Sequence, residues 1–351
     1  MQTYDYIVVG AGSAGAAVAN RLSADPRNKV LLLEAGRASH PWSSIPIGMA
    51  RLITNPAANW LYSSEPEAST NGRRLPVPRG KLLGGSSSIN GMVFVRGQAQ
   101  DFDTWAQMGN RGWSYTEVLP FFKRMESYAG EGDDGFRGRE GPLRVTNPEP
   151  RDLLFATIIK AAAQVGIRHN PDYNGASQAG IAMSQATIAG GRRMSTAAVV
   201  ECDPPCQSKA ACLRAPYAPW HAMTGMEQSS AFVEGCVSDG CAVRIARAIM
   251  TAPAMTPFQM SEFAPGADRT TDDEILDWVK LAAETTYHPV GTCKMGSDPM
   301  AVVDAQLRLH GIAGLRVADA SIMPTLTSGN TNAPSIMIGE KAADMVLNAA
   351  I

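Results

Sequence analysis

The sequence lacks both a long apolar run and a large excess of charge of one sign. Its 351 residues carry 31 basic and 33 acidic side chains, a formal net charge of −2. No stretch approaches the roughly 18 consecutive apolar residues of a transmembrane helix, which excludes a membrane span of that kind. A nearly neutral chain also has no broad positive field to attract nucleic acid or an anionic membrane surface, so we expect neither partner.

Signals for export and for disulfide bonds are equally scarce. The N-terminus has neither the basic start nor the small-residue cleavage site of a signal peptide, and Asp5 interrupts it early. Five of the six cysteines fall between residues 202 and 241, but without a secretory context they predict no disulfide framework. The C-x3-C-x5-C spacing of Cys202, Cys206 and Cys212 matches no common zinc module, so no metal site is predicted. We expect a soluble, cytoplasmic protein.

The most informative residues are YDYIVVGAGSAGAAV at positions 4–18. An apolar strand precedes Gly10, Gly12 and Gly15, which have G-x-G-x-x-G spacing; a helix, a second strand (KVLLL) and Glu34 follow. This order is typical of a dinucleotide-binding βαβ unit. The first glycine allows a tight turn, the second leaves room for a pyrophosphate, and the third lets helix and strand pack closely. The helix N-terminus attracts phosphate, and Glu34 can accept hydrogen bonds from a ribose hydroxyl.

Hydrophobic periodicity divides the rest of the chain coarsely. Helical spacing of apolar residues predicts helices at 101–126, 152–166, 272–286 and from about Pro334 onward. Gly166 is the expected C-cap of the second of these helices. A strand is predicted at 141–147, and extended loops are predicted over 37–80. Residues 201–230 combine Cys, Pro and Met without helical or strand period, which predicts a long irregular loop.

Three blocks of sequence together resemble the glucose–methanol–choline (GMC) family of FAD-dependent oxidoreductases, in particular its choline-dehydrogenase-like members. They are the N-terminal unit ending in LLLEAG at 31–36, RGKLLGGSSSINGMVFVRGQAQDFDTW at 79–105, and YHPVGTCKMG at 287–296 with GLRVADASIMPTLTSGNTNAPSIMIGEKAADM at 314–345. The resemblance implies an α/β fold (α+β overall). A Rossmann-like FAD-binding domain would comprise residues 1–140 and 285–351, and a second, truncated antiparallel-sheet substrate domain would comprise residues 141–284.

The same resemblance implies FAD as the cofactor and a set of residues that would contact it. Glu34 would bind the adenosine ribose, and the Gly/Ser turn with Asn90 would follow the pyrophosphate and isoalloxazine. The full set is Gly10, Gly12, Ser13, Ala14, Gly15, Glu34, Ala35, Gly84, Gly85, Ser86, Asn90, Gly91, Val93, Asp319, Ala320, Asn332 and Pro334. Some family members hold FAD covalently through a histidine in the Gly/Ser turn. Ile89 occupies that position here, so FAD is expected to be non-covalent.

Oxidation of an alcohol to a carbonyl removes a hydride from carbon and a proton from the hydroxyl group. A flavin accepts the hydride, and histidine is the side chain best suited to accept the proton. His288, one of only five histidines, stands in the matching family position, and the family's second active-site residue falls at Asn332. Asn332 would donate a hydrogen bond to the developing alkoxide. The predicted partner is therefore a small-molecule alcohol, and the electron acceptor, oxygen or another molecule, stays open.

The chain departs from the family in its centre. Family members are longer, and the resemblance stops after RRMSTAAVV at 192–200 and resumes near AFVEG at 231–235, which predicts an internal deletion. Such a deletion would leave unpaired strand edges and exposed apolar surface. The alternatives are a flavin-binding remnant without activity and a non-redox flavoprotein similar to hydroxynitrile lyases. An NAD dehydrogenase is supported by the first glycine motif alone. The alcohol, the choice between oxidase and dehydrogenase, and the oligomeric state stay open.

Overall fold

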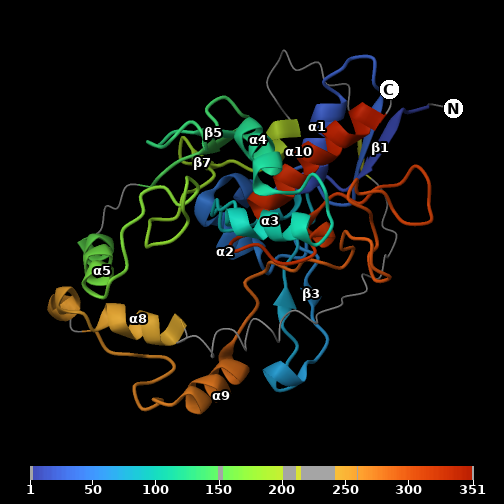
Figure 1. Cartoon of the computed structure of the whole chain (residues 1–351). Coiled ribbons are helices and arrows are strands. Elements are labelled where there is room, and N and C mark those ends of the chain that lie inside the picture. Colours follow the sequence, from blue (N-terminus) through green and yellow to red (C-terminus); the bar gives the residue numbers. More distant parts are fainter. Residues whose placement is uncertain (1–2, 149–152, 201–210, 215–241, 259, 350–351) are drawn as a thin grey trace.

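The computed structural model describes residues 3–148, 153–200, 211–214, 242–258 and 260–349 (Figure 1). Its N-terminal unit joins strand β1 (Tyr6–Val9) to strand β2 (Val30–Glu34) through helix α1 (Ser13–Leu22). The two strands are parallel, and their register pairs Tyr6 with Val30 and Val9 with Leu33. The predicted βαβ unit is confirmed.

A third strand of this sheet comes from the segment for which an irregular loop was predicted. Strand β9 (Ala211–Arg214) runs parallel to β2 on the side away from β1, with Leu31 opposite Ala211. The prediction is therefore wrong for these four residues. A strand this short has too few residues to display a period, and its position is decided by the free edge of β2 rather than by its own sequence. The rest of the 201–230 segment lies outside the described residues.

Helix α10 (Asn332–Ala349) packs directly on α1 (Figure 1). A Cβ atom at Gly339 would stand 2.4 Å from the carbonyl oxygen of Ala14, so this close crossing requires glycine. The buried carboxylate of Glu340 accepts hydrogen bonds from Arg21 of α1 and from Arg124 at 2.8 and 2.6 Å. The helix begins two residues before Pro334, close to its predicted start.

The single helix predicted at 101–126 is two helices, α3 (Ala99–Gln107) and α4 (Tyr115–Met125). Gly109 and Gly112 adopt φ angles of +97° and +89° between them, which ends the first helix. A capping box at Ser114 then starts the second. Aromatic and aliphatic side chains from both helices enter the main core, and the buried ones are Phe102, Trp105, Val118, Phe122 and Met125.

The segment predicted as extended loops over 37–80 contains short elements instead of a continuous coil. They are η1 (Pro41–Ser44), η2 (Pro46–Gly48), α2 (Met49–Leu52), β3 (Tyr62–Ser63), η3 (Ala68–Thr70) and β4 (Pro76–Val77). Strands β3 and β4 form a two-stranded antiparallel ladder. The segment carries Arg79 at its end toward the predicted Gly/Ser turn.

The expected second sheet is small among the described residues. Strand β6 (Leu143–Val145), inside the predicted 141–147 strand, pairs in parallel with β5 (Glu126–Tyr128). Antiparallel pairing in this region is limited to β7 (Ile188–Ala189) with β8 (Arg192–Arg193) and to isolated bridges. Helix α6 (Ala197–Val200) then packs on α1.

Three further helices lie away from the main sheet (Figure 1). Helix α5 (Leu153–Gln164) confirms the helix predicted at 152–166, and Gly166 follows it with a φ of +85°. This helix contacts α8 (Ala242–Met250) and η5 (Pro253–Phe258). Helix α9 (Asp272–Ala282) ends before the predicted residue 286. In the described part of the chain, no helix is long and apolar enough to cross a membrane.

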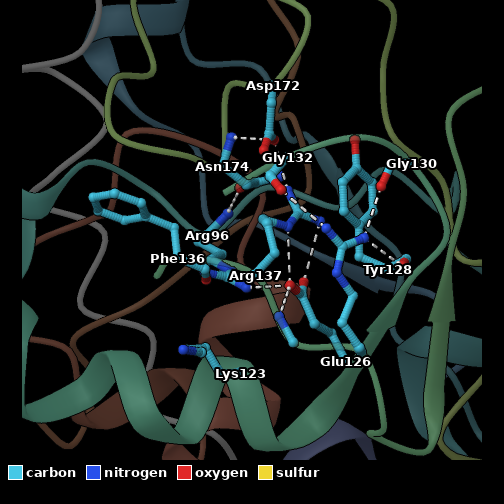
Figure 2. Close-up of polar contacts among 12 residues, drawn as sticks. Arg96, Lys123, Glu126, Tyr128, Gly130, Gly132, Phe136, Arg137, Asp172 and Asn174 are labelled. Atoms are coloured by element: carbon cyan, nitrogen blue, oxygen red, sulfur yellow. Dashed lines mark hydrogen bonds and ion pairs between the residues drawn. The ribbon is translucent and has the colours of Figure 1, made fainter. Parts of the chain in front are cut away.

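A buried group of paired charges ties β5 to the block that follows the Gly/Ser turn (Figure 2). The fully buried Glu126 carboxylate forms ion pairs with Arg96 and, at 3.0 Å, with Arg137. Arg137 also donates to Asp172 at 2.7 Å and lies over the ring of Tyr128. Two cations and two anions therefore balance one another, and we call these four charged residues the Glu126 cluster.

Candidate functional site

The turn between β1 and α1 leaves backbone groups exposed beside open space. Gly12 is the N-cap of α1 and supplies no side-chain cap, and a Cβ atom at Gly10 or Gly12 would meet no atom within 4 Å. A Cβ atom at Gly15, in contrast, would lie 1.9 Å from the carbonyl oxygen of Gly10. The turn therefore combines a close helix–strand contact with free space at the helix N-terminus, where N–H groups lack partners within the helix. Ser13 and Ala14 open that helix.

Glu34 lies at the end of β2 and holds the same turn in place. Its two carboxylate oxygens accept hydrogen bonds from the N–H groups of Ala11 and Gly36, at 2.9 and 2.7 Å. A carboxylate has about four lone-pair sites, so acceptor capacity is left for a hydroxyl group. A pocket of about 320 Å³ adjoins this end of the strand, and it is lined by Ala35, Gly36, Arg37, Pro56, Ala57 and Lys81.

The Gly/Ser turn abuts the first glycine turn. Its helical part is η4 (Gly85–Ser88), preceded by Gly84, whose N–H donates to the carbonyl oxygen of Ala11 at 2.8 Å. A Cβ atom at Gly85 would lie 2.7 Å from Cα of Gly12. The two segments predicted to contact FAD are thus adjacent, with an open helix terminus and a pocket beside Glu34. These residues fit a dinucleotide.

Arg193 of β8 is a residue that sequence reasoning missed. Its NH1 group donates to the carbonyl oxygen and to Oδ1 of Asn90, both at 2.7 Å. The side chain is buried, Nε and NH2 have no hydrogen-bond partner, and no carboxylate of the described residues pairs with it. Burial lowers the pKa of Arg193 to about 10. A buried cation with unused donors beside Asn90 suits an anionic ligand. In the sequence, the two adjacent arginines at 192–193 are the feature that could have drawn attention to Arg193.

His288 lies in the loop after α9, with both ring nitrogens in contact with the chain before α10. Nδ1 is 3.0 Å from Oγ1 of Thr331, and Nε2 is 2.8 Å from Nδ2 of Asn330. Burial, and then the charge of Arg79, lower the pKa of His288 to about 4. The imidazole is therefore neutral at pH 7 and able to accept a proton.

The structure places Asn332 differently from Asn330. Asn332 is the first residue of α10, and its Oδ1 accepts a hydrogen bond from Oγ of Ser13 at 2.7 Å. This contact joins the starting turns of α10 and α1, and Pro334 is buried in the first turn of α10. The residues at the ring of His288 are Asn330 and Thr331, which the sequence did not single out. The sequence feature that could have identified them is the GNTN run at 329–332, because it places a second asparagine two positions before Asn332.

Asp319, Gly91 and Val93 are further predicted site residues. Asp319 caps η6 (Ala320–Ile322), accepting from the N–H of Ser321 at 2.8 Å. Gly91 and Val93 line a second pocket of about 400 Å³. Its other lining residues come from the 148–159 and 181–186 segments and are mostly apolar: Pro148, Phe155, Ile158, Ile159, Ile181, Ala182, Met183, Ser184, Gln185 and Ala186. Polar groups are few in this pocket, and no acidic side chain lines it.

Metal ligands do not gather among the described residues, where no group of three or more His, Cys, Asp or Glu side chains could hold an ion. Cys293 carries a free thiol. The cysteines of the unusual C-x3-C-x5-C spacing are not placed as side chains, because Cys202 and Cys206 lie outside the described residues and only the backbone of Cys212, in β9, is described.

Comparison with known proteins gives consistent matches along the chain. Residues 4–211 match one family model described as GMC oxidoreductase, and residues 239–339 match another of the same description. The oxygen-dependent choline dehydrogenases of Sinorhizobium fredii and Brucella ovis are 31% and 30% identical to the chain, over 98% of it and 95% of each relative. The alignment with the first spans 524 positions, more than the 351 residues of this chain, so part of it consists of gaps here.

Solved structures share the fold. Pyridoxine 4-oxidase from Mesorbium loti superposes with a TM-score of 0.85 at 23% identity and covers 99% of both chains. A fungal aryl-alcohol oxidase gives a TM-score of 0.76 at 17% identity over 100% of both chains. The family matches leave residues 212–238 unmatched, a stretch that overlaps the predicted junction.

Proposed function

Because this chain belongs to the GMC oxidoreductase family, whose cofactor is FAD, we propose that it oxidises the CH–OH group of an alcohol to a carbonyl. The observation that carries the proposal is a neutral, partly buried histidine in the family's motif, held between Asn330 and Thr331. FAD, when bound, supplies a hydride acceptor at N5. The residues of the chain bind and orient the alcohol, and they accept its proton.

His288 is the base of this proposal. Its Nδ1 lies 3.0 Å from Oγ1 and 3.4 Å from the backbone N–H of Thr331, and the shorter contact, together with Asn330 at Nε2, favours one tautomer. If Nδ1 carries the proton and donates it to Oγ1 of Thr331, then Nε2 is left with its lone pair and accepts from Asn330. An alcohol that replaces Asn330 at Nε2 would give its hydroxyl proton to that nitrogen. The low pKa keeps the nitrogen unprotonated before the alcohol arrives.

Asn332 is proposed to act on the developing alkoxide. Ser13 holds its Oδ1, which orients the amide and leaves Nδ2 as the group that donates. The N-terminus of α10, which begins at Asn332, adds a positive helix end in the same place. Both effects stabilise negative charge without competing for the proton that His288 takes.

The second pocket indicates the kind of alcohol. Gly91 and Val93, proposed to lie near the flavin ring, share it with Phe155 and Ile158. No carboxylate lines it and Phe155 is its one aromatic residue, whereas a quaternary ammonium group is usually held by an aromatic cage. We therefore propose an uncharged alcohol with an apolar alkyl or aryl body rather than choline.

The domain boundaries are also proposed, at residues 1–140 with 285–351 for FAD and 141–284 for the substrate. The main core draws side chains from α1, α4 and α10, and α5 has a separate small core with η5. Leu143 and Val145 of β6 belong to the main core, so the second domain starts in contact with the first.

Anaerobic addition of alcohols to the purified, FAD-loaded protein tests the function. Bleaching of the flavin bands by benzyl alcohol or a long-chain primary alcohol is expected, with choline less effective. Failure of every alcohol to bleach an intact flavin spectrum would overturn alcohol oxidation.

That failure would favour a second candidate, a flavin-binding remnant without a competent substrate pocket. One observation supports it: Ile7 and Val9 of β1 are 61% and 78% exposed, although parallel sheets are normally covered on both faces. The two candidates differ in a single readout, because both bind FAD and only the enzyme is bleached by alcohol.

A further inference from the structure

The residue before His288 has an unusual backbone conformation. Tyr287 adopts a φ of +69°, in the left-handed region that bulky L residues rarely occupy. Conformations of this kind persist only where surrounding contacts hold them, and they concentrate at functional sites. Because Tyr287 and His288 share a peptide unit, the rotation at Tyr287 sets the direction in which the imidazole leaves the backbone.

Two hydrogen bonds hold the Tyr287 backbone. Its N–H donates to Oγ1 of Thr285 at 3.0 Å, a local contact. Its carbonyl oxygen accepts from NH1 of Arg79 at 3.0 Å, a contact across 208 positions of sequence. The second contact therefore ties the loop that carries His288 to the residue that opens the RGKLLGG block.

Arg79 is itself firmly anchored. Its N–H donates to Oδ1 of Asn59 at 2.9 Å, its carbonyl oxygen accepts from the N–H of Trp60 at 2.8 Å, and NH1 also donates to Pro78. Burial lowers the pKa of Arg79 to about 10, and the charge of Asp319 opposes that shift. No carboxylate of the described residues lies within ion-pair distance of its guanidinium. Partial burial of the Arg79 guanidinium without an ion pair indicates that this side chain has a role other than pairing with a carboxylate.

We propose that Arg79 is a positioning residue, whose guanidinium holds the Tyr287 peptide in the left-handed conformation and so aims the His288 imidazole at the substrate. This inference rests on the proposed function of His288 and adds to it. Arg79 need not touch the alcohol, because it acts on the backbone of the neighbouring residue. A displacement of about 1 Å at a reacting group is enough to cost on the order of 100-fold in rate.

The test uses the FAD-loaded protein and the rate of anaerobic flavin reduction by benzyl alcohol. Arg79→Met removes the donor, and we expect a reduction rate about 10- to 100-fold lower with the flavin spectrum unchanged. Glycine adopts positive φ without help, so adding Tyr287→Gly should restore a large part of the lost rate. Adding Tyr287→Ala removes the same side chain but keeps the strained φ, and it should restore nothing.

Equal rates in the glycine and alanine double variants, or an unchanged rate in Arg79→Met, would overturn the inference. If Arg79→Met loses FAD, Arg79→Lys takes its place. The rates of flavin reduction are then compared after adding Tyr287→Gly or Tyr287→Ala to Arg79→Lys. A His288→Ala variant separates the two proposals. A normal rate of flavin reduction in His288→Ala would refute the proposal that His288 is the base. A slow rate in His288→Ala together with a normal rate in Arg79→Met would refute only the positioning role of Arg79.

Discussion

Two regions of the molecule bury arginine side chains, and they differ in what surrounds the charge. In the Glu126 cluster, Arg96 and Arg137 share two carboxylates, so the charges cancel inside the protein (Figure 2). Around the predicted flavin site, the half-buried Arg79 and the buried Arg193 have no ion pair among the described residues, and both donate to backbone carbonyl oxygens.

The difference separates stability from function. A balanced cluster is costly to disrupt but exchanges nothing with solvent or ligand. An unbalanced cation keeps an electric field and donors available, which is useful where an anion binds or where a neighbouring histidine must stay neutral. We expect substitutions in the first region to change folding and substitutions in the second to change cofactor binding and chemistry.

The largest effect should come from His288, on which the second region acts. His288→Ala should lower the rate of flavin reduction by alcohol about 100- to 10,000-fold, because it removes the general base. FAD should stay bound, as judged by the absorbance spectrum. His310→Ala is the matched control, since its ring is exposed and its one hydrogen bond among the described residues is to the carbonyl oxygen of Gly296. A rate near that of the control would refute the assignment.

Glu126→Ala should have the largest effect on folding. Removal of the buried carboxylate leaves Arg96 without an ion pair and Arg137 with Asp172 alone, and we expect the free energy of unfolding to fall by about 3–5 kcal/mol. Urea denaturation measures it. Glu65→Ala breaks the exposed pair with Arg74 and should cost less than about 1 kcal/mol. Similar losses in both variants would show that the cluster is not a special contributor to stability.

Arg193→Met tests whether the unpaired cation serves the cofactor. We expect the affinity of the apoprotein for FAD, measured by fluorescence titration, to fall about 10- to 100-fold, because charge-assisted hydrogen bonds are lost. Arg192→Met is the control, since Arg192 neighbours it on β8 but is exposed. If Arg193→Met instead lowers unfolding free energy and leaves FAD affinity intact, Arg193 belongs with the structural arginines.

The smallest expected effect is a shift in pH dependence. The acid limb of kcat/KM in the free enzyme should have an apparent pKa well below the usual 6.5 of histidine, near 4, since burial and then Arg79 disfavour the protonated ring. Activity is lost as the pH falls through that value. Arg79→Gln removes the nearby cation, and it should move the acid limb toward higher pH. A limb that stays in place would leave burial as the sole cause.

Much of the site follows from local spacing in the sequence. The tight turn and the close helix–strand packing involve Gly10, Gly12 and Gly15, which lie within six residues of sequence. Glu34 ends the strand that follows. Helix α5 and its glycine cap were predicted for the same reason, because helical period and caps are properties of neighbouring residues. Family resemblance added His288 and Asn332, whose roles stay predictions.

The sequence by itself thus determined the βαβ unit, the glycine turns and most helices. Only the tertiary structure decided that Asn330 meets the ring of His288, that Arg193 contacts Asn90, and that Arg79 holds Tyr287. These contacts join positions 42, 103 and 208 residues apart. No local period encodes such a pairing, because it depends on which buried surfaces meet once the helices and strands have packed.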